Sequence, residues 1–296
     1  MKPEFDWGTL VIWYFFLGGV AGGAYLTATL AELFGEPGDR EMAKVGYTIA
    51  FPLVLVCAVL LIADLGHPER FWELLFTTAP VGLMFKAQSP IQIGGYALLG
   101  FGLFSFLSLL DVWVEEGRLK FAPLRGFYNA VPRKLYAGLG ALFGFFLAGY
   151  TGVLLNTTAQ AAWAESPFIG ALFVASAAST GAAAIALVMA LRRRPEADTA
   201  ATRLTRMDNA AIVIEVVIVL LVLATGTTLA SGLLSGAFAL WFWAFVATGI
   251  IVPLVLQMRA SLGGAHLPAN LIVLASALVL IGGLIIRYAI VMVAQT

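Results

Sequence analysis

The sequence predicts an all-α protein with eight membrane-spanning helices, and three observations point to this fold class. Of the 296 residues, 61 % are hydrophobic and 11 % are charged, whereas an average soluble domain has about 25 % charged residues. The chain contains long charge-free runs, of which residues 7–31 are the first. About 20 apolar residues cross the roughly 30 Å of bilayer hydrocarbon, so the chain has room for about eight spans.

Charge-free runs place these spans along the chain. The run from Val216 to Met258 has 43 residues, which is too long for one span, and the turn signals Ser231-Gly232 and Ser235-Gly236 divide it. Glu32 and Asp111 end two of the runs and read as ordinary boundary residues. We expect spans at residues 9–33, 44–64, 90–111, 135–156, 168–191, 209–231, 236–258 and 268–294.

The eight spans can form two four-helix bundles, an N-terminal one in residues 1–160 and a C-terminal one in residues 161–296. The polar stretch 192–208 reads as a linker between helices. Glycine pairs such as Gly18-Gly19, Gly22-Gly23 and Gly94-Gly95 lie within the expected spans. Small residues allow close helix approach in lipid, and the alternative is that some of these glycines leave space for a flat ligand.

Lysine and arginine predict the orientation. Thirteen of them lie in the loops after the first, third, fifth and seventh spans, three lie on the other side, and Arg287 lies inside the last span. Cytoplasmic loops are enriched in these residues. We therefore expect both termini on the outer, periplasmic side of the inner membrane.

Cofactor ligands are scarce in this chain. The single cysteine, Cys57, cannot form an intrachain disulfide, and it cannot hold an iron–sulfur cluster alone because such clusters need several thiolates. Only His67 and His266 could ligate a haem. We expect no haem, no iron–sulfur cluster and no metal site in this chain. The 17 basic and 17 acidic residues balance, and we expect no nucleic-acid partner.

Several polar side chains are expected near the outer face. The second span ends in Asp64 and His67, and a histidine titrates near neutral pH, so this pair could pass protons; the alternative is a solvated interfacial cap. Gln88 precedes the third span, where Ser89 reads as an N-cap and Pro90 as the first helical residue. Three more residues have hydrogen-bonding side chains on this side: Tyr14, Tyr150 and Asn156. For Tyr150 and Asn156 the alternative role is interfacial anchoring.

Two charged residues lie deeper in the expected spans. Glu215 lies about two turns into the sixth span from the cytoplasmic side, and Arg287 lies about two turns into the eighth from outside. A charge at such depth is costly unless it is paired or hydrated. Because the two approach from opposite sides, we expect no direct ion pair between them. Together with Asp64 they mark a polar interior that could carry protons.

These motifs together resemble the NrfD-like family of polysulfide reductase membrane subunits. The resemblance is carried by residues 13–23 (WYFFLGGVAGG), 64–68 (DLGHP), 89–90 (SP) and 150–152 (YTG). It extends over the whole chain in topology, but its motifs are confined to the first four spans. Tyr14 stands where some members have histidine or asparagine.

The resemblance implies a quinone-reactive subunit that is not catalytic alone. The quinone, menaquinone or ubiquinone, would lie near the outer face in the first four spans, with Tyr14 and Tyr150 beside it. Asp64 and His67 match the second-span motif and are candidates for proton transfer. Implied partners are a four-cluster ferredoxin-like iron–sulfur subunit and a molybdopterin catalytic subunit. Membrane lipid would surround the chain, and the whole complex could form a dimer.

Two other functions stay open. Glu215 and Arg287 would suit a proton or ion secondary transporter, which needs a broken helix or charged cavity near the membrane midplane. The chain could also be a passive membrane anchor for a catalytic subunit. The substrate of that subunit, the direction of electron flow and proton pumping are not decided by the sequence.

Overall fold

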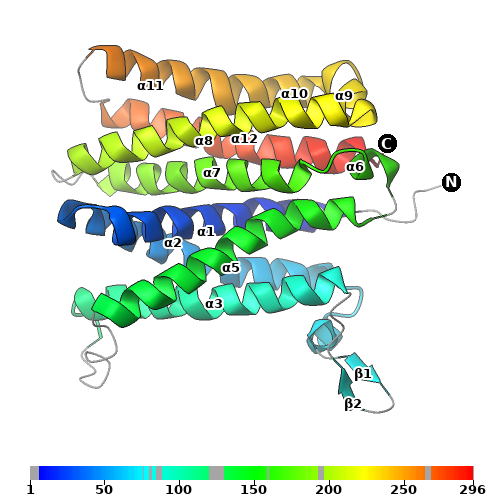
Figure 1. The fold of residues 1–296 in the computed structure, drawn as a ribbon, viewed down its shortest axis with the longest axis horizontal. Helices are drawn as coiled ribbons and strands as arrows, with labels where there is room; N and C mark the ends of the chain where they lie inside the picture. Colours follow the sequence, from blue (N-terminus) through cyan, green and yellow to red (C-terminus); the bar gives the residue numbers. More distant parts are fainter. Residues whose placement is uncertain are drawn as a thin grey trace.

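A computed structural model describes residues 7–75, 77–79, 82–84, 89–119, 130–158, 160–192, 197–263 and 268–295. Long helices run side by side through the molecule (Figure 1). Within these residues, eight segments are long and apolar enough to cross a membrane, as the sequence predicted. They are α1 (Thr9–Phe34), α2 (Arg40–Asp64), α3 (Pro90–Glu115), α5 (Ala130–Asn156), α7 (Ile169–Arg192), α8 (Ala197–Thr225), the continuous α10 (Ala239–Phe245), η3 (Val246–Ile251) and α11 (Val252–Gly263), and α12 (Ala269–Val293).

Short elements connect the spans. A small antiparallel hairpin, which the all-α expectation did not include, pairs Thr77 with Met84. Ser89 accepts a hydrogen bond from the Gln92 amide at 3.4 Å, and Pro90 is the first residue of α3, as the N-cap prediction required. The remaining short elements are η1 (Pro37–Asp39), η2 (Pro68–Leu74), β1 (Thr77–Ala79), β2 (Gly82–Met84), α6 (Ala161–Ala164) and α9 (Thr227–Leu234).

The sixth and seventh spans differ from the expectation in their boundaries. α8 begins at Ala197 and not at residue 209, so much of the stretch predicted as a linker is helical. It ends at Thr225 because Gly226 leaves the helical conformation, and the expected turn at Ser231 lies inside α9. The chain reverses at Ser235, as predicted. The π-helical η3 ends two residues before Pro253, whose missing N–H disturbs the regular helical ladder.

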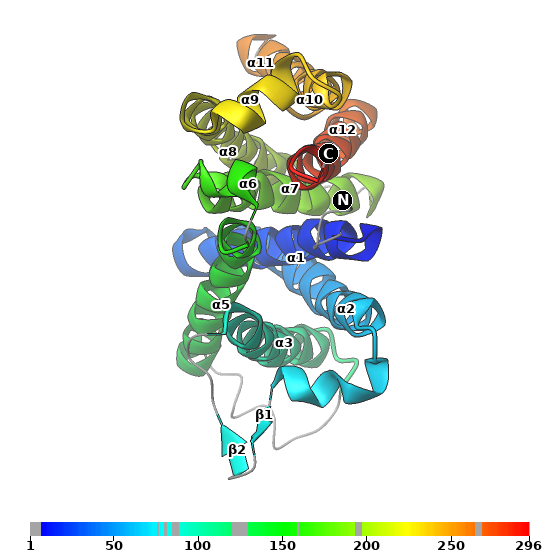
Figure 2. The ribbon, with the colours of Figure 1, turned by 90° about the vertical axis from the view of Figure 1, so that its right-hand side faces the viewer.

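The spans form two groups that meet at α1 and α7. Figure 2 shows α1 and α7 at the centre, with α2, α3 and α5 on one side and α8, α10–α11 and α12 on the other. We call α1, α2, α3 and α5 the first bundle, and α7, α8, α10–α11 and α12 the second bundle. Since α1 also packs against α7, the domain boundary at residue 160 stays a prediction.

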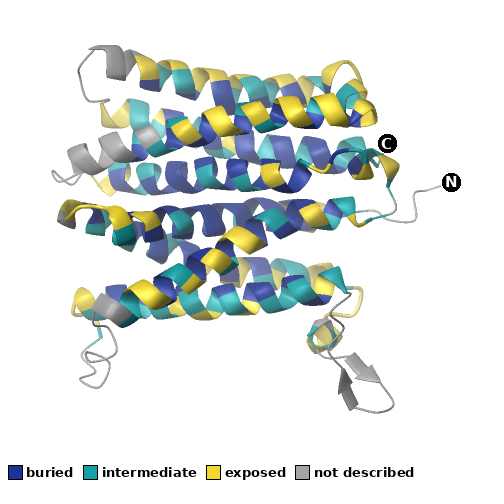
Figure 3. Ribbon diagram, in the orientation of Figure 1, coloured by how far each residue is buried: buried dark blue, intermediate teal, exposed yellow. Residues whose placement is uncertain are grey.

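Burial follows this arrangement. α1 and α7 are the most buried spans, whereas the outer helices alternate between buried and exposed residues (Figure 3). Leu99, Leu103, Leu142 and Leu220 are each more than half exposed. Apolar side chains on the perimeter of a membrane protein face hydrocarbon and not water, so this surface fits a bilayer.

α1 and α7 touch backbone to backbone. A Cβ atom placed on Gly23 would overlap the carbonyl oxygen of Ala177, and one placed on Gly181 would overlap the backbone of Gly23. Only glycine permits this approach, so of the two roles predicted for the glycine pairs, Gly23 has the first, close helix packing. Close packing of this kind is what holds helices together in lipid.

The two ends of the molecule are distinct. The Trp7 backbone amide donates to the Gln295 side chain at 2.9 Å, so the two ends of the described chain lie side by side (Figure 1). We call this the terminal end. The C-terminal ends of α1, α3, α7 and α11 and the N-terminal ends of α2, α5, α8 and α12 lie at the opposite end (Figure 1).

An ion-pair cluster ties the first bundle together at the opposite end. Arg40 of α2 pairs with Glu32 of α1, with Asp111 at 2.6 Å and with Glu115 at 2.7 Å on α3. Arg133 of α5 also pairs with Glu32. The side chains of Glu32 and Asp111 are only 3 % and 4 % exposed. The interpretation of these two acids as ordinary boundary residues is therefore wrong.

A carboxylate from another segment caps α9 at the terminal end. Glu165 accepts hydrogen bonds from the Thr228 hydroxyl at 2.6 Å and from the Thr228 backbone amide at 2.8 Å. These bonds favour the charged carboxylate and lower the pKa of Glu165 below its ordinary value. Glu165 thus satisfies an amide at the α9 N-terminus that would otherwise lack a partner.

This cap predicts a pH dependence. Because the folded-state pKa of Glu165 is depressed, its stabilisation is present above the unfolded-state value, about 4.3, and is lost as pH falls through the lower folded-state value. We expect hydrogen-exchange protection of the α9 amides, corrected for intrinsic rates, to fall over that range. In Glu165→Gln the protection should already be low and independent of pH. The control is Glu116→Gln, because Glu116 pairs with Arg118 and not with α9; its α9 protection should match that of the parent. If Glu165→Gln left the protection of α9 unchanged, the capping role would be excluded.

Candidate functional site

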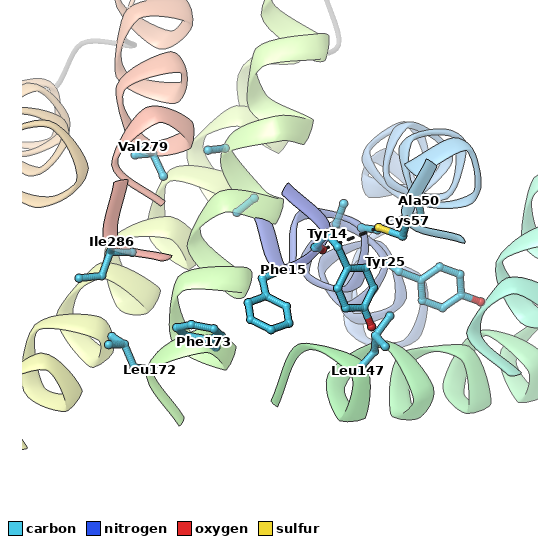
Figure 4. Packing of buried hydrophobic residues seen from close by; sticks show 14 of the residues in the cluster. Tyr14, Phe15, Tyr25, Ala50, Cys57, Leu147, Leu172, Phe173, Val279 and Ile286 are labelled. Atoms are coloured by element: carbon cyan, nitrogen blue, oxygen red, sulfur yellow. Dashed lines mark hydrogen bonds between the residues drawn. The ribbon is translucent and has the colours of Figure 1, made fainter. Parts of the chain in front are cut away.

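Tyr14 supplies an unpaired hydroxyl inside the first bundle. It lies on the N-terminal half of α1 and is 2 % exposed. Figure 4 shows its ring extending from α1 toward Leu147 of α5. Its backbone carbonyl accepts a weak hydrogen bond from Cys57 of α2 at 3.9 Å. Its hydroxyl makes no hydrogen bond with the part of the chain that the structure describes, so it is available to a ligand.

Tyr150 lies close to Tyr14. Its ring packs over Gly94 of α3, where any side chain would overlap it, and its hydroxyl donates to the Pro90 carbonyl at 2.6 Å. The two phenol groups are close enough to interact electrostatically. The structure thus brings together the two tyrosines that the sequence predicted, between α1, α3 and α5. Gly94 accommodates the Tyr150 ring, so here a glycine clears space for a flat side chain.

Asp64 and His67 lie nearer the surface of the terminal end. Asp64 ends α2, and its carboxylate lies beside Gly8 at the start of α1. It follows Cys57 by seven residues, which is about two turns or 10 Å of helix. The His67 side chain is 76 % exposed, with its Nδ1 atom 3.1 Å from Glu69 Oε1. These two residues can exchange protons with water, but the structure does not place His67 against the tyrosines.

Two other predicted residues contribute less to this site. Gln88 lies outside the described residues. Asn156, at the end of α5, donates to the backbone carbonyls of Trp163 and Ser166, each at 2.7 Å. The Trp163 indole in turn donates to the Ile290 carbonyl of α12 at 2.8 Å. Asn156 therefore fastens α6 between the two bundles, and its amide hydrogens are already used.

Glu215 and Arg287 meet through a serine. Arg287 of α12 is 1 % exposed and donates to Ser176 Oγ of α7 at 3.0 Å, to the Gly283 carbonyl at 2.7 Å and to the Phe173 carbonyl at 3.3 Å. The Ser176 side chain also interacts with the carboxylate of Glu215, which is 3 % exposed. Among the described residues the two charges form no direct ion pair, as expected, and Ser176 joins them instead.

This trio, Glu215, Ser176 and Arg287, also contacts the first bundle. The Arg287 guanidinium lies against Gly19 of α1 and 6.0 Å and 5.4 Å from the ring centres of Phe16 and Phe173. Glu215 Oε1 and Arg287 Nε are buried without a hydrogen-bond partner in the described structure. Unsatisfied buried polar atoms are rare in native proteins and often belong to functional groups.

The sequence interpretation missed the contacts of three side chains near the terminal end: Gln92, Tyr96 and Trp7. Gln92 and Tyr96 of α3 both donate to the Leu75 carbonyl, at 2.7 Å and 2.6 Å, and so fix the loop after η2. The Trp7 indole nitrogen is buried with no partner among the described residues. A glutamine inside an apolar run is a detectable signal, whereas Trp7 looks like an ordinary interfacial aromatic. No group of three or more histidine, cysteine, aspartate or glutamate residues in the described ranges could hold a metal ion.

Eight apolar helices that enclose tyrosines, a glutamate and an arginine define a multi-pass integral membrane protein with a polar interior. A family model described as "Polysulphide reductase, NrfD" matches residues 1–296. The chain therefore belongs to the NrfD family, as the motifs in the first four spans indicated.

Curated relatives agree with this assignment. The C component of polysulfide reductase from Wolinella succinogenes is 26 % identical, over 98 % of this chain and 98 % of the relative. Protein NrfD of Escherichia coli K12 is 24 % identical, over 85 % of this chain and 83 % of that protein. The C component of selenate reductase from Mesobacillus selenatarsenatis is 28 % identical over 27 % of this chain and 18 % of the relative.

Proposed function

We propose that this chain is the haem-free, quinone-reactive membrane subunit of a molybdopterin oxidoreductase complex. The observation that carries the proposal is the hydroxyl of the buried Tyr14, which has no partner in the described structure and lies beside Tyr150. A buried donor without an acceptor is unfavourable, and a quinone head group offers two carbonyl acceptors.

The candidate site residues fall into two groups, one for quinone binding and one for proton transfer. Tyr14 would donate to a head-group oxygen of menaquinone or ubiquinone, and Tyr150 would complete the polar surroundings. A bound quinone supplies chemistry of two electrons and two protons. Asp64 and His67, near the surface of the terminal end, would exchange the quinone's protons with water, and Glu215 with Arg287 would offer a polar route through the second bundle.

The electrons require partners. The chain has one cysteine and two histidines, so a carrier on a neighbouring subunit must accept or supply them. The relatives named as components of polysulfide and selenate reductases support a complex with a four-cluster iron–sulfur subunit and a molybdopterin catalytic subunit. Those partners would dock on the terminal end, which the lysine and arginine distribution directs to the periplasmic side of the inner membrane.

Tyr14→Phe tests the quinone site. It removes one hydroxyl without changing the ring, and we expect quinol-dependent turnover of the purified complex to fall about tenfold, the size of one hydrogen bond of about 1.4 kcal/mol. Dye-dependent activity of the catalytic subunit should not change. Steady-state kinetics with a quinol analogue and with a dye measure the two separately.

Tyr288→Phe provides the matched control, since Tyr288 lies on α12 against Trp241. It should leave both activities unchanged. Equal quinol turnover in the parent, Tyr14→Phe and Tyr150→Phe would exclude this site. A complex that keeps its membrane attachment but shows no quinol turnover at all would favour a passive anchor.

A further inference from the structure

A second buried carboxylate lies in the second bundle and takes no part in the proposed quinone site. Asp208 of α8 is 5 % exposed. Ser179 of α7 donates to its Oδ1 atom at 3.2 Å, and Gln257 of α11 donates through Nε2 to its Oδ2 atom at 2.6 Å. No lysine or arginine side chain that the structure describes pairs with Asp208. A buried carboxylate without a cation is strongly disfavoured in a membrane.

A small cavity adjoins this carboxylate. Its volume is about 20 Å³, whereas one water molecule needs roughly 10–15 Å³ by the same kind of measure. It therefore has room for one small occupant. Helices α7, α8, α11 and α12 all contribute to its wall, which has a polar side formed by Thr205, Asp208, Gln257 and Ser276 and an apolar side formed by Ala182, Ala186, Leu204, Ile272 and Ala275.

An unpartnered oxygen belongs to this wall. Since the Nε2 atom of Gln257 is committed to Asp208, its Oε1 atom is left as an acceptor, and it is buried without a partner in the described residues. Gln257 and Ser276 are each 5 % exposed. The cavity thus combines a negative charge, an unsatisfied amide oxygen and a buried hydroxyl, and all three would be satisfied by a positive occupant.

We propose that this cavity binds one small monovalent cation, either Na⁺ or a proton carried by a water molecule, through Asp208, Gln257 and Ser276. Carboxylate, amide and hydroxyl oxygens are hard donors that suit hard cations. One carboxylate balances one positive charge, which disfavours a divalent ion. The site is independent of the quinone site because it lies in the other bundle.

The cavity is placed near the opposite end of the molecule. Leu204 and Thr205 precede Asp208 on α8, and Ile272 and Ser276 lie in the first two turns of α12. An ion could therefore reach it from the side predicted to be cytoplasmic. Glu215 lies seven residues further along α8, about 10 Å deeper, and is the charged neighbour that interacts with Asp208. From α7, α11 and α12 the described groups that face Asp208 are uncharged.

The test uses the full-length chain in lipid nanodiscs. NaCl replaces choline chloride at constant ionic strength while thermal unfolding and binding of radioactive sodium are measured. A ligand that binds only the folded state raises its stability with concentration, so we expect Na⁺ to raise the unfolding temperature. Asp208→Asn should abolish the response, and Ser276→Ala should weaken Na⁺ binding by about 10- to 100-fold, as loss of a supporting group does at metal sites.

Ser105→Ala is the matched control, because Ser105 is a buried serine of α3 that bonds only its own helix; it should respond to Na⁺ as the parent does. Infrared difference spectra distinguish the two cations. If the site takes a proton carried by water, acidification without Na⁺ produces a broad absorption band of protonated water that Asp208→Asn removes and Na⁺ does not displace. Neither an Na⁺ response nor such a band, or an Na⁺ response that survives Asp208→Asn, would overturn the proposal and leave a water-filled cavity.

Discussion

Replacing Gly23 with leucine is expected to prevent the two bundles from packing together. Even a Cβ atom at Gly23 overlaps the Ala177 carbonyl of α7, so a leucine side chain must push α1 and α7 apart. Overpacking in a protein interior typically costs about 1–3 kcal/mol, and here the displaced atoms are backbone. We expect a loss of at least about 3 kcal/mol, measured by thermal unfolding and by the yield of monodisperse protein on size-exclusion chromatography.

Gly138→Leu is the appropriate control. Gly138 also lies in a membrane-spanning helix, α5, but a Cβ atom there would meet no other atom within 4 Å. Leucine has the higher helix propensity, so this variant should be as stable as the parent or more stable. If Gly23→Leu and Gly138→Leu unfolded at the same temperature, the direct contact between α1 and α7 would not hold the bundles together.

This contact illustrates what the sequence could and could not predict. Hydropathy locates spans because hydrocarbon requires a long apolar run, and all eight were found. The glycines at positions 22–23 predict close packing, but they do not identify the partner helix. Gly23 meets Gly181, which is 158 positions away along the chain, and no local pattern encodes that pairing.

The charged residues show a similar division. Glu215 and Arg287 could be selected from the sequence because a charge inside a span is rare. Ser176, which joins them, could not, since a serine in an apolar helix usually bonds its own backbone. Glu32 and Asp111 were misjudged because a charge at a span boundary looks the same in sequence whether it faces water or Arg40. Asp208 was hidden by the polar stretch 192–208, which suggested a linker.

Removing the positive charge of Arg287 is expected to have the largest effect in the second bundle. Arg287→Met retains much of the side-chain volume but removes the hydrogen bonds to Ser176, Gly283 and Phe173. It also leaves Glu215 without its positive neighbour. Removing one partner of a buried charged pair costs about 3–5 kcal/mol, and we expect the unfolding free energy of Arg287→Met to fall by about this amount.

A double-mutant cycle separates the charge from the packing. If Glu215 is destabilised by the loss of Arg287, then Glu215→Gln in the Arg287→Met background should recover part of the stability, with a coupling of about 1–3 kcal/mol. Arg118→Met, at a side chain that is 66 % exposed, should change stability little. Additive effects of Glu215→Gln and Arg287→Met would mean that Ser176 does not couple the two groups, and the polar route through the second bundle would then lose its central link.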